Sequence, residues 1–484
     1  MKREEKFFYI LLGLITLGIA YIILAAEATF DKGDGIQHYL ISRYSWKYPE
    51  LLLHHWGKPV FTLISSPFAQ FGLKGIALFN LLCATLSAWC AYRLAKRLGI
   101  ANAWAVPFFL FFAVIYFPLI NSGLTEPFFG LMLIASVMLF TEQRYTAATL
   151  LASFMPLART EGVLFLPLFF ILLLYRKRYI PVLLLGTGLL LYSVIGYFVF
   201  KDIFWLITQN PYSGNPGSIY GYGEVLHFVK QYNNIWGLLL TLLLVTGMGV
   251  FTAELIKRRA EIRPAALFGR TAPPTYLAEE LVLIYGAFVI YFIAHTIFCI
   301  MGSLGLVRMM GAIIPVTALI CLRGFIWVKA QFAWSPLLKY AVSLLILVLV
   351  IRTPFKQYYY PYHLEGEEPV ALNTGDWLKK SEYKDRHLYY LHPYLTLAMD
   401  IDPFDTVKST ALWGLNREHP ENGLKEGSLV IWDAHYGPNE AQIKLEKLID
   451  NPNFRLLKTF EPVVPFTVLG GYDFKIHVFE CVAK

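Results

Sequence analysis

Residues 2–26 read KREEKFFYILLGLITLGIAYIILAA, and this stretch decides the class of the protein. A short basic start precedes an uninterrupted apolar run from Phe7 to Ala26, which matches the roughly 20 residues that a helix needs to cross a hydrocarbon core of about 30 Å. A cleaved signal peptide would have a shorter apolar core and a clear small-residue cleavage site. Ala25-Ala26-Glu27 matches such a site only weakly, so the stretch predicts an uncleaved transmembrane helix.

Further apolar runs follow along the chain. Only 16% of the residues are charged, whereas soluble domains average about 25%, and 56% are hydrophobic. The pattern predicts an α-helical polytopic membrane protein with about eleven transmembrane helices. We expect these spans at residues 7–26, 74–92, 103–120, 127–141, 145–158, 161–175, 180–200, 235–256, 281–300, 309–323 and 339–352.

The formal charge of +8 is distributed in short basic clusters between apolar runs, at residues 2–6, 93–97, 176–178 and 257–259. Clusters of this kind mark cytoplasmic loops and do not indicate a nucleic-acid partner. They predict a multi-pass protein with a cytoplasmic N-terminus, and we expect the bacterial inner (plasma) membrane as its location.

Residues 145–175 could form one long span or two short ones. A single span would place the basic cluster at 176–178 outside and would invert every later loop. Two spans keep it inside, with a break between Pro156 and Gly162. Charges at membrane depth are costly unless they face a cavity or a partner, so we expect Arg159 and Glu161 to lie in a polar recess that opens outward.

Three segments outside the spans are long. Residues 27–73 and 201–234 are the predicted outer loops of a membrane domain that covers residues 1–352. Residues 353–484 have the composition of a soluble domain, which this topology places on the extracytoplasmic side. Strand patterns at 428–432, 454–460 and 474–479, with an amphipathic helix at 439–449, predict a small C-terminal soluble α/β domain.

The first outer loop holds two carboxylates, Asp31 and Asp34, just after the first span. Carboxylates at this position could act as a general base or hold a divalent metal against a phosphate. Asp34 could instead cap the helix that starts near Ile36. The residues themselves leave both interpretations open.

Other polar residues gather at the predicted outer ends of spans. Residues 54–59, HHWGKP, combine cations with an aromatic ring, which suits a phosphate or a sugar, although Trp and Lys also serve as interfacial anchors. Glu126 could be a simple helix-start charge, and Arg159 could pair with Glu161. A cation such as Arg308 at a helix start favours an anionic partner. The candidate substrate-binding residues are His54, His55, Trp56, Lys58, Glu126, Arg159, Glu161, Tyr220, Tyr222 and Arg308.

These motifs, in this order, resemble those of the GT-C glycosyltransferases, which include the protein O-mannosyltransferases and the lipid A aminoarabinose transferase. The matching stretches are 30–39 (FDKGDGIQHY), 54–59, 125–127 (TEP), 157–162 (LARTEG) and the loop around Arg308. The resemblance covers most of residues 1–352 in layout. In this chain the two acidic residues are three positions apart, whereas in relatives they are often adjacent or alternate.

The resemblance implies a hexosyl- or mannosyltransferase-like enzyme that uses a polyprenyl-phosphate-linked sugar as donor. It implies a first-loop carboxylate, Asp34 or Asp31, as the base in an inverting transfer to a hydroxyl of a glycan, lipid or protein. No cofactor is certain, and Mg²⁺ or Mn²⁺ at Asp31 and Asp34 is left open. The alternative is a transporter or flippase for a lipid-linked glycan, which would tend to show internal repeats; none is evident.

Overall fold

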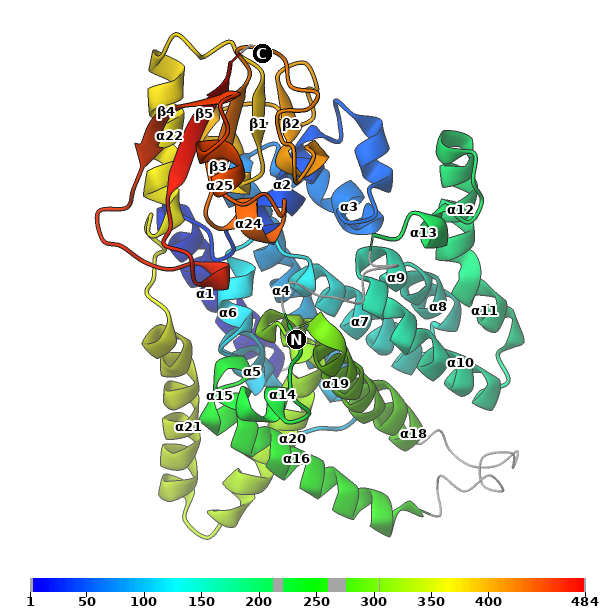
Figure 1. Cartoon of the computed structure of the whole chain (residues 1–484). Helices are drawn as coiled ribbons and strands as arrows, with labels where there is room; N and C mark the ends of the chain where they lie inside the picture. Colours follow the sequence, from blue (N-terminus) through cyan, green and yellow to red (C-terminus); the bar gives the residue numbers. More distant parts are fainter. Residues whose placement is uncertain (1–2, 212–220, 260–275, 304, 483–484) are drawn as a thin grey trace. The chain divides into compact units, whose positions relative to one another are not determined.

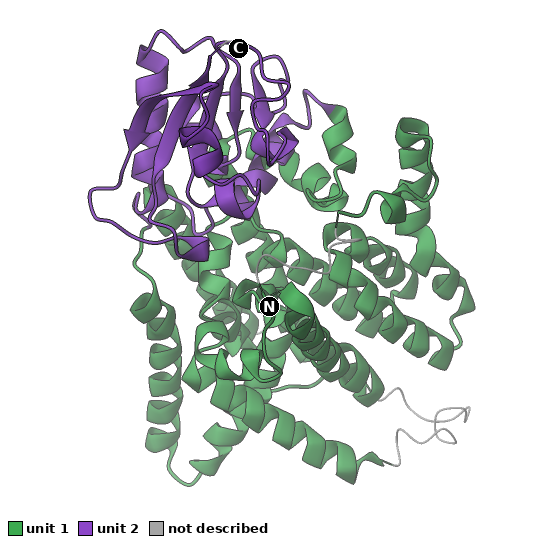
Figure 2. Ribbon diagram, viewed as in Figure 1, with its two compact units in different colours: residues 1–26, 49–361 green, residues 27–48, 362–484 purple. Residues whose placement is uncertain are grey.

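The computed structural model describes residues 3–211, 221–259, 276–303 and 305–482. The chain forms two compact units, drawn in different colours in Figure 2. Unit 1 comprises residues 1–26 and 49–361, and unit 2 comprises residues 27–48 and 362–484. The segment 27–48, expected to be part of an outer loop, therefore belongs to the same unit as the C-terminal tail.

Unit 1 is helical (Figure 1). Its longer helices are α1 (Arg3–Ala25), α3 (Pro59–Ala69), α4 (Gly72–Arg97), α7 (Glu126–Thr141), α10 (Leu166–Tyr175), α12 (Thr187–Phe200), α16 (Leu238–Lys257), α19 (Ala287–Phe298), α20 (Ile314–Gln331) and α21 (Pro336–Gln357). Its shorter helices are α5 (Val106–Phe111), α6 (Tyr116–Ile120), α8 (Tyr145–Ser153), α9 (Met155–Ala158), α11 (Tyr179–Leu183), α13 (Trp205–Thr208), α14 (His227–Lys230), α15 (Tyr232–Ile235) and α18 (Leu277–Glu280). Short 3₁₀ or π turns are η1 (Pro49–Leu53), η2 (Ala103–Ala105), η3 (Thr160–Phe165), η4 (Leu184–Gly186), η6 (Leu281–Gly286), η7 (Cys299–Ser303) and η8 (Val307–Ile313).

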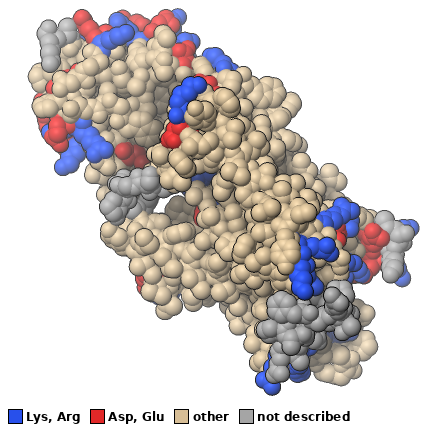
Figure 3. Space-filling view, turned by 90° about the vertical axis from the view of Figure 1, so that its right-hand side faces the viewer, with Lys and Arg blue, Asp and Glu red and all other residues tan. Residues whose placement is uncertain are grey.

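Among the described residues, seven helical segments are long and apolar enough to cross a membrane, and four shorter apolar ones accompany them. Leucines on several of these helices are exposed, including Leu17, Leu183, Leu337 and Leu344. In the space-filling view the charged side chains lie in separate groups, with wide uncharged areas elsewhere (Figure 3). Such apolar surface suits lipid rather than water, and the chain is an integral multi-pass membrane protein. The count of eleven spans stays a prediction.

Two predicted segments differ in the structure. The span expected at 103–120 is not one helix, because α5 ends at Phe111 and α6 begins at Tyr116. Between them the Ile115 N–H donates to the Ile235 carbonyl, 3.1 Å away, and so leaves the helical ladder. The outer loop expected at 27–73 is largely helical, since α3 lies within it.

The predicted break between residues 145 and 175 is confirmed. The backbone of Arg159 is extended, with φ −155° and ψ 137°, between α9 and η3. Gly162 lies so close to the backbone of Met155 that an added Cβ would approach it to 2.4 Å. The chain therefore folds back tightly around Arg159 instead of continuing as one helix.

Helices α16 and α20 approach each other through two glycines. A Cβ on Gly247 would come within 2.0 Å of the Ile320 carbonyl oxygen, and one on Gly324 within 2.0 Å of the Leu243 carbonyl oxygen. Small residues of this kind let the backbones of membrane helices touch.

We expect Gly247→Leu to lower the free energy of unfolding by about 3 kcal/mol or more, because the added side chain meets backbone that cannot move aside. Gly249→Leu, on the same helix, is the matched control, since no atom lies within 4 Å of its added Cβ. Thermal unfolding of both variants in the same detergent checks this, and equal stability would contradict the close packing.

Unit 2 contains a five-stranded mixed sheet in the order β2-β1-β3-β5-β4. The strands are β1 (Leu388–Tyr390), β2 (Ser409–Ala411), β3 (Leu429–Asp433), β4 (Phe454–Phe460) and β5 (Ile476–Cys481). β1 runs parallel to both β2 and β3, whereas β5 runs antiparallel to β3 and β4. Every residue of β3 and β5 is buried, and the predicted small C-terminal α/β domain is confirmed.

The helices of unit 2 are α2 (Asp34–Tyr44), α22 (Glu367–Lys380), α23 (Pro393–Met399), α24 (Tyr436–Asn439) and α25 (Glu446–Ile449), with short turns η9 (Leu412–Gly414) and η10 (Leu469–Gly471). The predicted helix at 439–449 is wrong in extent, because α24 ends at its first residue and only its last turn, α25, is helical besides. Gln442 has a φ of 57°, a value that interrupts a right-handed helix.

Candidate functional site

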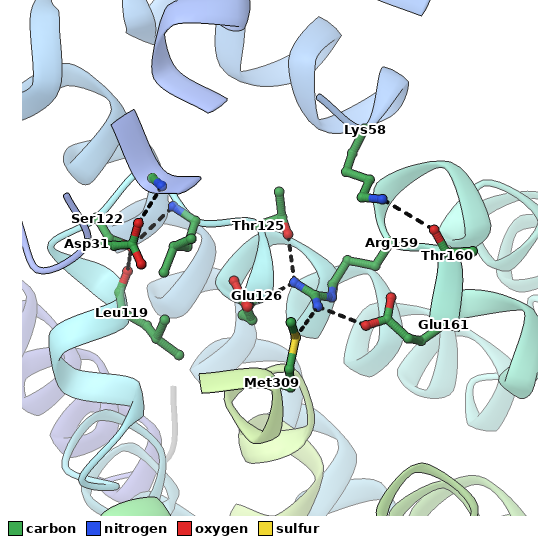
Figure 4. Close-up of polar contacts among 12 residues, drawn as sticks. Asp31, Lys58, Leu119, Ser122, Thr125, Glu126, Arg159, Thr160, Glu161 and Met309 are labelled. Atoms are coloured by element: carbon green, nitrogen blue, oxygen red, sulfur yellow. Dashed lines mark hydrogen bonds and ion pairs between the residues drawn. The ribbon is translucent and has the colours of Figure 1, made fainter. Parts of the chain in front are cut away.

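The centre of the polar cluster in unit 1 is Arg159, whose guanidinium is buried (Figure 4). Its Nη1 lies 2.9 Å from Glu126 Oε1 and donates to Thr125 Oγ1, also at 2.9 Å. Thr125 and Glu126 stand at the start of α7, where Pro127 occupies the first turn and fixes the helix start. The extended backbone at Arg159 turns the side chain towards this helix start.

The other terminal nitrogen of Arg159, Nη2, contacts the remaining members of the cluster. It lies 2.8 Å from Glu161 Oε1 and 2.6 Å from the sulfur of Met309. His295 Nε2, from α19, lies 3.8 Å from the same oxygen of Glu161. The predicted Arg159–Glu161 pair is thus present, and Glu126 joins it from a distant part of the sequence. Two carboxylates face one guanidinium, a geometry that fixes the Arg159 side chain firmly.

Lys58 lies close to this cluster. It is 8% exposed, and its Nζ donates to Thr160 Oγ1 at 3.3 Å (Figure 4). Its φ of 63° is a left-handed conformation that costs energy for a residue with a Cβ. A buried lysine held in such a conformation indicates that its position is maintained by the surrounding structure.

The histidines of the 54–59 motif have structural contacts. His54 Nδ1 accepts the Gly57 N–H at 3.1 Å, which stabilises the turn before α3. His55 Nε2 lies 2.8 Å from the Leu206 carbonyl oxygen, and its ring packs edge-on against Trp205. Trp56 is half-buried. A substrate-binding role for His54, His55 and Trp56 stays a prediction.

A cavity of about 630 Å³ lies beside the loop that leads to Arg308. Its lining includes Tyr222, Glu224, His227, Gly305 and Val307. His227 Nε2 lies 2.7 Å from the Gly305 carbonyl oxygen, and this contact joins the segment around His227 to the loop before Arg308. Arg308 stands in the first turn of η8, next to Met309 of the Arg159 cluster. The predicted residue Tyr220, like Tyr212, lies outside the described residues.

In unit 2, the two carboxylates of the first loop differ in their roles. Asp31 Oδ1 accepts the Gly35 N–H at 2.6 Å and so caps the first turn of α2. Asp34 is the first residue of α2, so the N-cap position before the helix is occupied by Gly33, which makes no side-chain cap hydrogen bond. The interpretation of Asp34 as the helix cap is therefore wrong, because Asp31 has that function. Asp34 is half-buried, and its part in chemistry stays a prediction.

Unit 2 also holds a polar cluster that no sequence motif indicated. Glu367 Oε2 lies 2.6 Å from His392 Nε2, and its Oε1 lies 2.8 Å from His435 Nδ1. His392 follows β1 and His435 follows β3, two parallel neighbours in the sheet. Polar residues just beyond the carboxyl ends of parallel strands are the signal that could have identified them.

Glu367 and its histidine partners shift one another's pKa values towards the charged forms. Burial alone would raise the pKa of Glu367, but hydrogen bonds from His392 and His435 outweigh it and hold that pKa well below its usual range. Burial alone would lower the pKa of His435, but the hydrogen bond to Glu367 outweighs it and the pKa is raised. Burial raises the pKa of Asp433.

These shifts predict a pH dependence of stability. The raised pKa of His435 stabilises unit 2 fully below about pH 6.5, and this contribution is lost as the pH rises through the raised value. The lowered pKa of Glu367 stabilises it above about pH 4.3, and that contribution is lost only in acid, as the pH falls through the lowered value.

We therefore expect the stability difference between the wild type and His435→Gln to shrink from pH 6 to pH 9. Pulse proteolysis of the full chain, scored by cleavage within residues 362–482, measures this difference. His419→Gln is the control, because His419 pairs with Glu421 at the surface. A difference that stays constant with pH would contradict the proposed coupling.

Among the described residues, no group of three or more His, Cys, Asp and Glu side chains is arranged to hold a metal ion. Within unit 2, Asp31 already accepts a backbone N–H through one carboxylate oxygen. A divalent metal at Asp31 and Asp34 stays a prediction.

The fold has known counterparts among solved membrane proteins, although no family model and no curated protein sequence matches the chain. The likeness extends over 97% of this chain and 97% of each of the two counterparts named here, and it shows that the fold is shared. Two of these counterparts are crystal structures of ArnT from Cupriavidus metallidurans. One is bound to undecaprenyl phosphate, with 11% identity and a TM-score of 0.55, and the other is in the apo state, with 12% identity and a TM-score of 0.53. The expected fold class, a helical membrane protein with a small C-terminal α/β domain, is confirmed, and this fold is ArnT-like.

Proposed function

We propose that this protein is a glycosyltransferase that moves a sugar from a polyprenyl-phosphate-linked donor to an acceptor hydroxyl at the extracytoplasmic face of the membrane. The observation that carries the proposal is the likeness in fold, over nearly the whole of both chains, to ArnT bound to undecaprenyl phosphate. The buried polar cluster at Arg159 adds to it, because charged groups inside a membrane protein mark functional sites.

The phosphate of the donor needs cations, and Lys58 and Arg308 are the ones we assign to it. Both Nη groups of Arg159 are already engaged by Glu126, Glu161 and neighbouring atoms. Arg159 therefore positions η3 and α7, whereas the lysine ammonium can reorient its three donors towards a phosphate. The cavity beside the loop at residues 305–307 would receive part of the donor.

The transfer itself would be a single displacement. Asp34 would accept the proton of the acceptor hydroxyl, the hydroxyl oxygen would attack the anomeric carbon, and the bond from that carbon to the phosphate oxygen would break. The polyprenyl phosphate would leave with the bonding electron pair, offset by Lys58 and Arg308. Attack from the side opposite the leaving group inverts the anomeric centre. We propose a hexosyl or mannosyl donor and a glycan, lipid or protein acceptor.

The proposal is tested with the full chain in nanodiscs and a set of undecaprenyl-phosphate-linked hexoses. Release of undecaprenyl phosphate that depends on the protein is the expected result. Movement of an intact lipid-linked sugar across the bilayer without cleavage would indicate a flippase instead. If neither cleavage nor specific binding of undecaprenyl phosphate occurs, the proposal is wrong.

We expect Lys58→Met to weaken the binding of undecaprenyl phosphate about tenfold, the loss of one hydrogen bond to a charged group. Lys74→Met is the matched control, because Lys74 lies at the start of α4 and its Nζ donates to the Leu24 carbonyl. Native mass spectrometry of both variants measures the affinity. If both variants bind undecaprenyl phosphate equally weakly, the assignment of Lys58 to the phosphate site is wrong.

A further inference from the structure

His435 is held by Glu367 in a way that leaves one imidazole nitrogen accessible. Its Nδ1 lies 2.8 Å from Glu367 Oε1, and its side chain is 29% exposed. Its Nε2 makes no hydrogen bond within the part of the chain that the structure describes. A carboxylate at Nδ1 fixes the tautomer of a histidine and makes Nε2 the nitrogen that can take up a proton.

His392, the other histidine that contacts Glu367, has a different role. His392 is fully buried, and its Nδ1 accepts the Tyr394 N–H at 3.2 Å. Its Nε2 must then carry the hydrogen and donate it to Glu367 Oε2, 2.6 Å away. His392 thus holds the Glu367 carboxylate in place and keeps it anionic, while the His435 side chain stays partly exposed.

This cluster adjoins the first-loop segment within unit 2. The ring of Tyr436 stacks on His435, with centroids 4.4 Å apart. A Cβ on Gly33 would come within 2.8 Å of the Tyr436 hydroxyl. Burial raises the pKa of Tyr436 well above its usual value, and the charges of Glu367, Asp433, Asp31 and Asp34 raise it further. Asp31 and Asp34 are therefore near neighbours of the residue that stacks on His435.

We infer that the His435–Glu367 pair is a proton acceptor for the first-loop carboxylate, and this inference rests on the proposed transferase function. In each turnover the O–H bond of the acceptor breaks and Asp34 binds the proton. The proton then passes to Nε2 of His435, and the imidazolium is stabilised by Glu367. Loss of that proton to water restores both groups. Glu367 is the positioning residue of the pair.

The charges around His435 favour its protonated form. The groups that face it are Glu367 on α22, Asp433 at the end of β3, Tyr436 and Glu440 around α24, and His392 before α23. Of the carboxylates, Glu367, Asp433 and Glu440 all raise its pKa against the effect of burial. A purely structural histidine could be fully enclosed like His392, whereas the His435 side chain is 29% exposed.

Chemical rescue tests this inference. We expect His435→Ala to lower the rate of sugar transfer about 10²-fold, as for loss of a proton-transfer group, and added imidazole to restore a large part of it. Glu367→Gln should lower the rate and shift the acidic limb of the pH–rate profile to lower pH, because a proton acceptor must be unprotonated and Glu367 raises the pKa of His435. His419→Ala is the matched control, because His419 also pairs with a glutamate but is exposed. It should retain the wild-type rate and show no response to imidazole.

A second measurement needs no variant and no activity. Diethyl pyrocarbonate reacts with the neutral Nε2 of histidine, so peptide mass spectrometry of the labelled full chain gives the pH midpoint of each residue. We expect the midpoint of His435 to lie above about 6.5, and Glu367→Gln to lower it.

The outcomes separate this inference from the function on which it rests. If wild-type protein does not cleave lipid-linked sugars, the proposed function fails, while labelling still tests the pair. If the wild type is active and His435→Ala matches His419→Ala with no response to imidazole, the inference is overturned and the transferase function stands. A His435 midpoint at or below 6.5 overturns it too, even where His435→Ala does not fold.

Discussion

Replacing Asp34 by Asn is expected to lower the rate of sugar transfer by about 10²- to 10⁴-fold, the usual contribution of a general base. Asp34 stands at the start of α2 and does not serve as its cap, since Asp31 Oδ1 accepts the Gly35 N–H. The substitution removes the charge and the proton acceptor while it keeps the size of the side chain. Release of undecaprenyl phosphate from a lipid-linked donor measures the effect.

Asp31→Asn is the matched variant for this test. Asn caps a helix about as well as Asp, so α2 should form and the rate should fall far less than in Asp34→Asn. If Asp31→Asn loses the activity and Asp34→Asn keeps it, the two roles are exchanged. Full activity in both variants would rule out a first-loop base.

Replacing Arg159 by Met is expected to lower the free energy of unfolding by about 3–5 kcal/mol, because it leaves the buried Glu126 and the partly buried Glu161 without their cation. The Glu126 side chain is only 1% exposed, and its Oε2 has no hydrogen-bond partner in the described chain. Met has a similar volume, so lost packing contributes little. Thermal unfolding in nanodiscs gives the change, and sugar transfer should be lost with it.

Two further variants make this prediction sharp. Lys230→Met breaks the pair of Lys230 with Glu224, which is exposed on both sides, and should change the stability by less than about 1 kcal/mol. Adding Glu126→Gln and Glu161→Gln to Arg159→Met should recover part of the lost stability, because the uncompensated charges disappear. A drop no larger than that of Lys230→Met would show that the buried cluster does not hold η3 and α7 together.

Features that depend on local sequence could be predicted well. Apolar runs long enough to span a bilayer gave most of the long helices, because each satisfies its backbone hydrogen bonds internally. The interruption near Arg159 followed from the sidedness of the basic cluster at 176–178, which one long span would have placed outside. The pairing of Arg159 with Glu161 was within reach, since the residues are two apart. The strand predicted at 428–432 is β3 almost to the residue.

Features that depend on contacts between residues far apart in the sequence could not be predicted. Nothing near Ile115 in sequence shows that its N–H will bond to Ile235, so the break between α5 and α6 was missed. The arrangement of His392 and His435 around Glu367 requires α22 and two strand ends to meet. Glu126 was singled out as a helix-start charge, but its contact with Arg159 joins residues from two separate segments.

The composition of unit 2 has a consequence for biosynthesis. Residues 27–48 leave the ribosome early, whereas the rest of their unit begins only at Tyr362. The Glu27 N–H bonds to the Tyr362 carbonyl at 2.8 Å, a contact that can form only after every intervening helix has been translated. Closing so long a loop is entropically costly and slow. Unit 2 therefore cannot complete its folding until the chain beyond Tyr362 has been synthesised, so its two parts form one unit only at the end of translation.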